Sequence, residues 1–385
     1  MPDLFHPVRV AIDGNEANCQ QRVGSNVYAY QMLVAMAEIV KNKRRHFQVT
    51  VLLSAPPVRD MPAESKCWRY QVLRPQKLWT QLALPVYLFV NQYQYDVFYT
   101  PGHYGPRWSS VPYISSVMDL AFVYYPELFA PGDLYQLENW TRYSVKRARK
   151  VVAISKYTKN EIAKVYHKKP SEIIVAYPAL AETGRVVAVG RQEKILARLG
   201  INKKYFLYLG TLQPRKNIIR IVEAFETLRA KNKHADYLLV LAGKNGWLTG
   251  EIDEKIASSP ERERIVMTGF VNQEQKTTLL SNAIATLNLG LYEGFGIPAL
   301  ESLAFGTLPI VAHNTSLPEV VGSAGLSVNP WRVASIAKAM QIAARFSKPQ
   351  HKKFMSLASR QVMKFSYQKS ADLVLTAIYR LGRNK

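Results

Sequence analysis

Short apolar runs alternate with amphipathic stretches along the whole chain. In the first half, runs of strand length occupy residues 8–13, 48–54, 96–100, 111–118, 150–155 and 173–177. Apolar positions within 25–40 recur at helical spacing, and Ser155 stands where the N-cap of a helix reaching His167 is expected. This alternation predicts parallel sheets in an α/β architecture.

A second series of the same kind fills the rest of the chain. Its strand-like runs are 205–210, 237–243, 265–270, 283–289 and 308–312. Residues 178–200 carry small and charged side chains without strong periodicity, as a linker would. We therefore predict two Rossmann-like domains, 1–190 and 191–365. A helix expected at 367–381 either ends the second domain or crosses back to the first, and its periodicity does not choose between them.

The most informative stretch reads Leu-Gly-Leu-Tyr-Glu-Gly-Phe-Gly-Ile-Pro-Ala-Leu-Glu and begins where one apolar run ends. Gly294 and Gly296 permit a tight turn, and Pro298 suits the first position of a helix. Glu293 then lies on the loop and Glu301 in the first helical turn. Open backbone amides at a helix start attract a diphosphate, and the two carboxylates could hold sugar and ribose hydroxyls. The alternative is that an acidic residue there only complements the helix dipole, which is worth ~0.3–1 kcal/mol.

A second loop carries complementary chemistry. It reads Gly-Thr-Leu-Gln-Pro-Arg-Lys-Asn and follows the run 205–210. Arg215 and Lys216 could neutralise a departing diphosphate. The arginine guanidinium can donate two parallel hydrogen bonds, and the lysine ammonium supplies a compact positive charge. The alternative is an ordinary loop with two exposed cations. We favour the functional interpretation because this loop and that of Glu293 both follow strands of one sheet, where such folds bind ligands.

The length and composition of the chain bear on its domain number and its cellular compartment. The chain has 385 residues, enough for two domains with separate cores. Its two cysteines, Cys19 and Cys67, form neither a metal-binding nor a disulfide pattern, which fits a reducing cytoplasm. No signal-peptide pattern precedes the first strand, and the longest apolar run, 78–90, is too short to span a bilayer.

The formal net charge of +23 is the strongest compositional signal. Lysine and arginine gather in 41–45, 142–150 and 156–169, and again near the C-terminus. An anionic membrane attracts such residues by ~1 kcal/mol each, and a solvated basic surface and nucleic acid are the alternatives. We favour the membrane, then the plain basic surface, and nucleic acid least, because no nucleic-acid-binding motif accompanies the charge.

Together these motifs resemble the family 4 glycosyltransferases. The stretch from Glu293 to Glu301 resembles the family's E-x7-E signature, and 210–217 resembles its G-T-x-x-P-R-K-N segment. Further segments match in the expected order at 241–244, 268–271 and 316–322. The resemblance implies an α/β fold of the GT-B type, with two Rossmann-like domains facing a central cleft and a C-terminal helix, about 366–385, crossing back to the N-terminal domain. It also implies retention of anomeric configuration, with no required metal or other cofactor.

The resemblance also implies roles for individual residues. Arg215 and Lys216 would hold the diphosphate of a nucleotide-sugar donor. Glu293 would meet the donor sugar, and Glu301 the ribose. The loop 316–319 either lies near the site or caps a helix. The residues expected to bind the donor are Gly24, Gly210, Thr211, Arg215, Lys216, Gly269, Phe270, Val271, Glu293, Gly294, Phe295, Gly296 and Glu301, with Gly269 to Val271 beside the nucleobase.

The first domain departs from the family at one position. Residues 24–28 resemble its glycine-rich loop, with Asn26 in place of a second glycine. Relatives commonly have a histidine beside the reacting sugar where this chain has Met118, which cannot donate a hydrogen bond or carry charge. His103 could substitute for it, or be a loop residue without a role. We prefer a mechanism in which the leaving phosphate takes the acceptor proton and Asp119 orients hydroxyls.

The sequence therefore predicts a retaining hexosyltransferase of polysaccharide biosynthesis. Its candidate catalytic residues are Asp119, Arg215, Lys216, Glu293 and His103. It would move a hexose, mannose by resemblance to mannosyltransferase-like branches, from a nucleoside-diphosphate sugar to a saccharide or lipid-linked glycan acceptor. We expect it in the cytoplasm, peripheral on the inner face of an anionic membrane, without nucleic acid.

Other functions of the same fold stay open. Met118 favours a non-catalytic or altered protein that binds sugar nucleotides. A nucleotide-sugar epimerase or a phosphorylase-like enzyme is a further alternative, which the context of Glu293 and Glu301 argues against.

Overall fold

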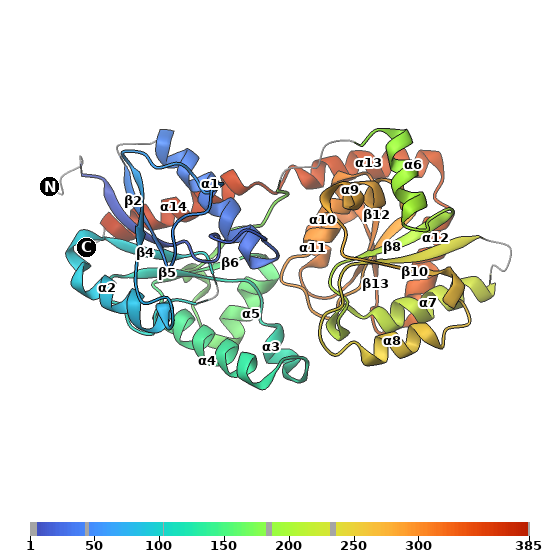
Figure 1. The fold of residues 1–385 in the computed structure, drawn as a ribbon, viewed down its shortest axis with the longest axis horizontal. Helices are drawn as coiled ribbons and strands as arrows, with labels where there is room; N and C mark the ends of the chain where they lie inside the picture. The colour runs from blue at the N-terminus through green and yellow to red at the C-terminus, as the bar shows by residue number, and fades with distance from the viewer. Residues whose placement is uncertain (1–5, 43–45, 103, 182–186, 232–235, 384–385) are drawn as a thin grey trace. The chain divides into compact units, whose positions relative to one another are not determined.

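The computed structural model describes residues 6–42, 46–102, 104–181, 187–231 and 236–383. The chain divides into two compact units (Figure 1). Unit 1 comprises Met1–Ala181 and Ser366–Lys385, and unit 2 comprises Glu182–Phe365. The sequence-based division lay at 190, whereas the first unit ends at Ala181.

Unit 1 contains a seven-stranded sheet in the order β3-β2-β1-β4-β5-β6-β7. Every neighbouring pair is parallel, with Val10 of β1 opposite Val49 of β2 and Val97 of β4. The strands are β1 (Val8–Asp13), β2 (Phe47–Leu53), β3 (Trp68–Val72), β4 (Val97–Thr100), β5 (Tyr113–Val117), β6 (Lys150–Ala153) and β7 (Ile173–Val175). The strand order reverses beside β1, so the carboxyl ends of β1 and β4 flank the position where such sheets bind ligands.

Helices cover both faces of this sheet. Figure 1 shows α1 on one side and α2 and α4 on the other. The helices are α1 (Ser25–Asn42), α2 (Leu84–Val90), α3 (Ala121–Tyr124), α4 (Pro131–Arg147), α5 (Lys156–Tyr166) and α14 (Tyr367–Arg383), with short turns η1 (Trp79–Ala83), η2 (Gln92–Gln94), η3 (Pro126–Leu128) and η4 (Pro170–Glu172). The predicted N-cap is confirmed, because the Ser155 hydroxyl accepts a hydrogen bond of 2.9 Å from the Thr158 amide.

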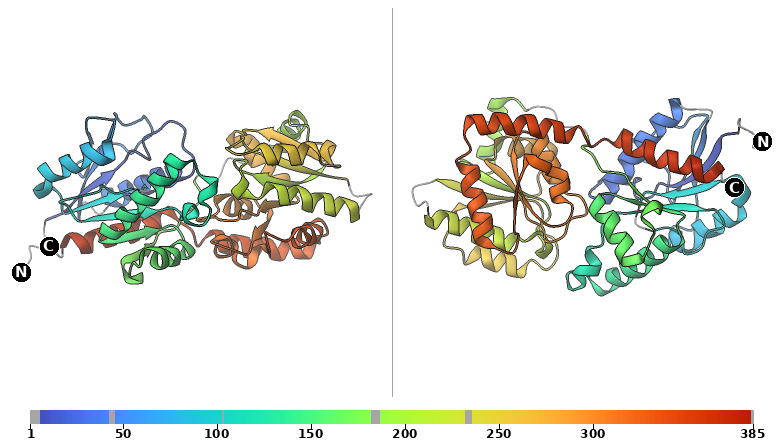
Figure 2. Two further views of the ribbon diagram at one scale, coloured as in Figure 1. Left: turned by 90° about the horizontal axis from the view of Figure 1, so that it is seen from below. Right: turned by 180° about the vertical axis from the view of Figure 1, so that it is seen from behind.

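The C-terminal helix belongs to unit 1. Helix α14 contacts α1 and the strands β1, β4 and β7 (Figure 2). The Ser370 hydroxyl donates to the Tyr177 carbonyl at 2.7 Å. Of the two placements that the sequence left open, the crossing back to the first domain is therefore confirmed.

Unit 2 contains a six-stranded parallel sheet in the order β10-β9-β8-β11-β12-β13. The strands are β8 (Lys204–Leu209), β9 (Tyr237–Ala242), β10 (Ile265–Gly269), β11 (Ala285–Asn288), β12 (Leu308–Ala312) and β13 (Leu326–Val328). The helices are α6 (Val189–Arg198), α7 (Ile218–Lys231), α8 (Gly250–Ala257), α9 (Gln273–Asn282), α10 (Ile297–Ala304), α11 (Leu317–Val321), α12 (Val333–Ala344) and α13 (Lys348–Val362), with short turns η5 (Pro214–Lys216), η6 (Arg262–Arg264) and η7 (Gly322–Ala324). Figure 1 shows α6 and α9 on one side of this sheet and α7 and α8 on the other.

Three local predictions need correction. The stretch predicted as a linker contains α6, whose Ile195 is buried and whose Leu196 packs on the core of unit 2; its few apolar residues do have helical spacing, but they stand among small and charged residues and were overlooked. Strand β3 was missed because buried and more exposed residues alternate along this edge strand instead of forming an apolar run. Strand β13 was missed because it has only three residues.

None of the helices in the described ranges is both long and apolar enough to cross a membrane. Within the same ranges, no group of three or more His, Cys, Asp and Glu side chains is arranged to hold a metal ion.

Candidate functional site

The two loops with predicted donor chemistry meet at the centre of the sheet in unit 2. Strands β8 and β11 are neighbours, with Phe206 opposite Ala285. The Lys216 ammonium, from the loop after β8, donates to Glu293 Oε1 at 2.6 Å. The Leu291 amide donates to the Arg215 carbonyl at 2.8 Å. Side chains and backbone thus join the two loops at the carboxyl ends of their strands.

The charges at this junction do not cancel. Arg215 Nη1 lies 3.8 Å from Glu293 Oε2, and its guanidinium also donates to the Tyr292 carbonyl. The side chains of Lys216 and Glu293 are 21% and 17% exposed, so the ion pair is partly buried but accessible to a ligand from solvent. Two cations beside one carboxylate leave a net positive charge, which suits an anionic ligand.

Tyr208 lies beneath the same loops. Burial raises the pKa of its phenol, the negative charge of Glu293 raises it further, and Arg215 lowers it. The phenol donates to the Thr211 carbonyl at 2.8 Å. Tyr208 therefore stays neutral and supports the backbone of the first loop.

The Glu293 loop is fixed by the strand that follows. The Ser316 hydroxyl is fully buried and lies 2.8 Å from the Glu293 carbonyl and 2.9 Å from the Phe295 carbonyl. The Asn314 amide donates to the Leu291 carbonyl at 2.6 Å. Ser316 is the N-cap residue of α11, but its side chain forms no capping hydrogen bond, because its hydroxyl is directed to the Glu293 loop.

Helix α10 begins one residue earlier than predicted. Gly296 is its N-cap with φ +105°, and a Cβ there would lie 2.5 Å from Leu317 Cδ2, so this position requires glycine. Pro298 is consequently the second helical residue and Glu301 lies beyond the first turn, which corrects both placements. The Glu301 carboxylate accepts a hydrogen bond of 2.6 Å from the Lys276 ammonium of α9.

The segment predicted to lie beside a nucleobase follows β10. Gly269 has φ +66°, and its carbonyl accepts a hydrogen bond of 2.9 Å from the Gly243 amide. Phe270 is 76% exposed, whereas Val271 packs against the core of unit 2. Phe270 is therefore the member of this segment with an aromatic face available for stacking.

Unit 1 has a polar pocket at the carboxyl ends of β1 and β4. Its volume is about 200 Å³. The Glu16 carboxylate accepts hydrogen bonds from Asn26 Nδ2 at 2.8 Å and from the Ser25 hydroxyl at 3.2 Å. The lining residues are Asp13, Asn15, Glu16, Asn26, Thr80, Thr100, Gly102 and Tyr104. Hydroxyl, amide and carboxylate groups of this kind suit the hydroxyls of a sugar.

Asp13 is the buried acid of this pocket. Burial raises its pKa from 3.8 to about 7, and the charge of Glu16 adds to the increase. The Asn15 amide donates to Asp13 Oδ1 at 3.0 Å and partly offsets it. Asp13 and Glu16 were not among the predicted site residues, although the Asp-Gly-Asn-Glu segment that begins at the last residue of β1 was a usable signal.

The other predicted residues of unit 1 fall in different places. Gly24 has φ +54° and precedes α1, outside the lining of the pocket. Asn26, which replaces the second glycine of the family pattern, uses its side chain to hold Glu16. Met118 is buried, and Asp119 Oδ1 accepts a hydrogen bond of 3.0 Å from the Ala121 amide. His103 lies outside the described residues.

Known proteins share both the sequence pattern and the fold. Residues 191–355 match the family model described as Glycosyl transferases group 1. O-antigen chain mannosyltransferase B of Escherichia coli is 26% identical over 250 residues, which is 64% of this chain and 65% of that protein. The chain spans less than two thirds of the length of the curated relatives that it matches first.

Solved structures extend the likeness to the whole chain. A glycosyltransferase from Rickettsia africae superposes with a TM-score of 0.71 at 15% identity, covering 99% of this chain and 100% of that one. Anabaena HepE in complex with UDP-glucose gives a TM-score of 0.68 at 16% identity, covering 97% and 100%. At such identities the likeness shows the fold.

The fold defines the class of this protein, the two-domain α/β proteins of GT-B type, as the sequence predicted. More particularly, the domain match to Glycosyl transferases group 1 lies within unit 2, and the relatives of the chain include proteins named as mannosyltransferases.

Proposed function

We propose that this chain is a retaining hexosyltransferase of family 4 type. It transfers a hexose from a nucleoside-diphosphate sugar to a saccharide or lipid-linked glycan acceptor in polysaccharide biosynthesis. Mannose is the proposed sugar because a matched relative is named as a mannosyltransferase. The observation that carries the proposal is the pairing of Lys216 with Glu293, beside Arg215, at the carboxyl ends of β8 and β11.

The ion pair suggests how the donor is received. A diphosphate offers Lys216 and Arg215 more negative charge than one carboxylate does, so Lys216 exchanges Glu293 for the phosphates. The released carboxylate of Glu293 then accepts hydrogen bonds from the sugar. Glu301, held by Lys276, meets the ribose, and Phe270 stacks on the nucleobase.

The chemistry needs no nucleophile from the enzyme. The bond between the sugar C1 and the diphosphate oxygen breaks while the acceptor oxygen bonds to C1 from the same face, so configuration is retained. The acceptor proton passes to the departing phosphate oxygen. Arg215 and Lys216 stabilise the charge that develops on the diphosphate. This route explains how Met118 can stand where relatives have histidine, with Asp119 orienting hydroxyls.

The pocket of unit 1 is the proposed acceptor site. Asp13 and Glu16 accept hydrogen bonds from acceptor hydroxyls, and Tyr104 and Thr100 lie on the same lining. The Glu16 carboxylate repels anions, and Asp13, whose pKa is raised to about 7, can accept a hydrogen bond or, when protonated, donate one, so the pocket suits neutral, hydroxyl-rich ligands.

We also propose that the protein works in the cytoplasm, on the inner face of an anionic membrane. Basic residues of 142–150 and 156–169 belong to unit 1, as does the apolar segment 78–90, in which Leu78, Phe89 and Val90 are exposed. Liposome flotation tests this part: equal binding to anionic and uncharged vesicles would reject it.

A sugar-nucleotide-binding protein without transferase activity is the second candidate. Met118 favours it, since this buried side chain cannot replace a histidine. Slow hydrolysis of the donor in the absence of acceptor indicates a catalytic site, whereas binding without turnover indicates this second function.

A donor panel tests the main proposal. The purified protein is incubated with GDP-mannose, UDP-glucose and UDP-N-acetylglucosamine, and released nucleoside diphosphate is measured. Glu293→Gln should abolish release from the preferred donor. Glu226→Gln is the matched control, because Glu226 forms a similarly sheltered pair with Lys255 at 2.8 Å, outside the proposed site. No release and no thermal stabilisation with any donor would reject the enzyme and leave the fold unaffected.

A further inference from the structure

A second pocket of unit 1 lies at the amino ends of strands in the sheet. Strands β5 and β6 begin beside it, at Tyr113 and Lys150, whereas the proposed acceptor pocket lies where β1 and β4 end. One pocket is therefore at the amino ends of the parallel strands and the other at their carboxyl ends. The volume of this second pocket is about 600 Å³, and its lining residues are Ser109, Ser110, Val111, Pro112, Tyr113, Lys146, Arg147, Ala148, Arg149, Lys168 and Glu172.

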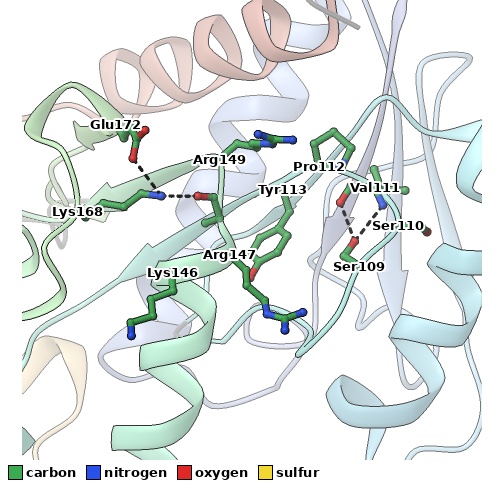
Figure 3. Close-up of a pocket in the computed structure, with 11 residues that line it drawn as sticks. Ser109, Ser110, Val111, Pro112, Tyr113, Lys146, Arg147, Arg149, Lys168 and Glu172 are labelled. Atoms are coloured by element: carbon green, nitrogen blue, oxygen red, sulfur yellow. Dashed lines mark hydrogen bonds and ion pairs between the residues drawn. The ribbon is translucent and has the colours of Figure 1, made fainter.

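Positive charge dominates this basic pocket. Figure 3 shows Arg147 and Arg149 between the segment from Ser109 to Pro112 and the pair of Lys168 with Glu172. The Lys168 ammonium lies 3.2 Å from Glu172 Oε2 and donates to the Ala148 carbonyl at 2.6 Å. This pair therefore fixes one wall of the pocket without adding net charge.

The remaining cations are available to a ligand. In the described part of the chain, Lys146, Arg147 and Arg149 form no ion pair, and all three are exposed. An arginine guanidinium can donate two parallel hydrogen bonds to two oxygens of a phosphate, and a lysine ammonium adds a compact positive charge. The chemistry of the pocket is therefore that of a phosphate-binding site.

One wall of the basic pocket continues into an exposed apolar surface. The Ser110 hydroxyl donates to the Leu88 carbonyl of α2 at 2.9 Å, and the Phe89 and Trp108 rings meet edge to face at 6.5 Å. These two rings belong to a group of exposed apolar side chains from α2, η2 and the segment before β5, called the apolar ridge below, whose exposure ranges from 43% for Trp108 to 85% for Tyr93. It consists of Val86, Phe89, Val90, Tyr93 and Trp108. Neighbouring exposed aromatic and aliphatic side chains of this kind are typical of surfaces that enter a membrane interface.

We propose that the basic pocket binds the headgroup phosphate of an anionic phospholipid while the apolar ridge enters the membrane interface. The proposal rests on the membrane association proposed above and identifies the surface responsible for it. The lipid is favoured over a soluble phosphate because the pocket and the ridge share the segment from Trp108 to Val111. Cations alone fit either ligand, whereas a soluble phosphate would leave the adjoining apolar ridge exposed to water.

Vesicle binding by matched double variants tests the proposal. Arg147→Ala with Arg149→Ala removes two charges from the pocket, and Lys66→Ala with Arg69→Ala removes two exposed charges near β3, at the other end of the strand order. With vesicles of equimolar phosphatidylcholine and phosphatidylglycerol, the first variant should bind about 30-fold more weakly, equivalent to ~2 kcal/mol at ~1.4 kcal/mol per tenfold. The second should stay within about threefold of the unchanged protein. Equal losses in both variants would overturn the pocket in favour of general surface charge.

Further measurements distinguish a lipid headgroup from a soluble phosphate as the ligand of the basic pocket. Phe89→Ser should weaken vesicle binding without changing any charge, and vesicles of phosphatidylcholine alone should bind poorly. Thermal stabilisation by glycerol phosphate, lost in the arginine variant but accompanied by no vesicle binding, would assign the pocket to a soluble ligand and overturn the proposal.

Donor turnover in solution keeps this test independent of the proposed reaction. The arginine variant and the unchanged protein should turn over donor equally and melt at similar temperatures. Absence of turnover with normal vesicle binding would reject the transferase and leave the pocket supported. Normal turnover without vesicle binding would support the transferase and reject the lipid-binding pocket.

Discussion

Lys216 and Glu293 lie 77 positions apart in the sequence and form an ion pair of 2.6 Å at the carboxyl ends of two neighbouring strands. Arg215 lies 3.8 Å from the same carboxylate. The pair holds the two loops together and leaves one positive charge uncompensated. In the proposed reaction it opens when a diphosphate binds, so it acts both in structure and in recognition of the donor.

Replacing Lys216 should weaken donor binding more than it weakens the fold. Lys216→Met removes one charge-assisted hydrogen bond to the diphosphate, so we expect the dissociation constant of the donor to rise by about 10- to 100-fold. Isothermal titration with the preferred donor measures it. Lys255→Met is the control, since it breaks a similar pair with Glu226 at 2.8 Å outside the site. The same loss of affinity in both variants would contradict the assigned role.

Removing the Ser316 hydroxyl should disturb the Glu293 loop selectively. Ser316→Ala deprives the Glu293 and Phe295 carbonyls of a buried donor, which costs about 1–3 kcal/mol of stability. We also expect lower donor turnover, because the loop loses its support. The comparison is Ser370→Ala, which removes a buried hydroxyl bonded to Tyr177 in unit 1. Urea unfolding and turnover are measured for both; unchanged turnover in Ser316→Ala would refute the link between loop support and activity.

Asp13 should make stability depend on pH. Its pKa is raised from 3.8 to about 7 in the folded protein, so between these values the folded state keeps a proton that the unfolded chain has lost. Stability should therefore fall as pH rises through this window, by up to about 4 kcal/mol in total. Asp13→Asn should remove this contribution and be more stable than the unchanged protein at higher pH. The measurement is the free energy of unfolding as a function of pH, and identical profiles for both proteins would disprove the assignment.

Neutralising Glu16 should affect the acceptor and spare the donor. Glu16→Gln weakens the hydrogen bonds that its carboxylate accepts from Asn26 and from acceptor hydroxyls. We expect the acceptor KM to rise about tenfold while donor hydrolysis without acceptor stays unchanged. Glu38→Gln, on the exposed side of α1, should alter neither value. An effect on donor hydrolysis equal to that on the acceptor KM would argue against an acceptor site in this pocket.

Local features of the chain were predictable because the backbone itself determines them. Ser155 caps its helix as expected, and a helix follows the glycine loop of Glu293. The starting residue of that helix was misjudged by one position, since a glycine in the left-handed region can itself serve as the N-cap. The linker prediction failed at α6, a short helix whose few apolar residues at helical spacing pack on α9 and the core of unit 2.

The sequence by itself determined the alternation of strands and helices, the loops that carry Arg215, Lys216 and Glu293, and the abundance of positive charge. Only the tertiary structure decided which of these groups meet. Strand order places β8 beside β11 and so pairs Lys216 with Glu293, and it buries Asp13 where its pKa rises. It also brings Arg147 and Arg149 to the segment after Trp108. Spacing along the chain cannot encode such encounters, because they depend on how distant strands pack side by side.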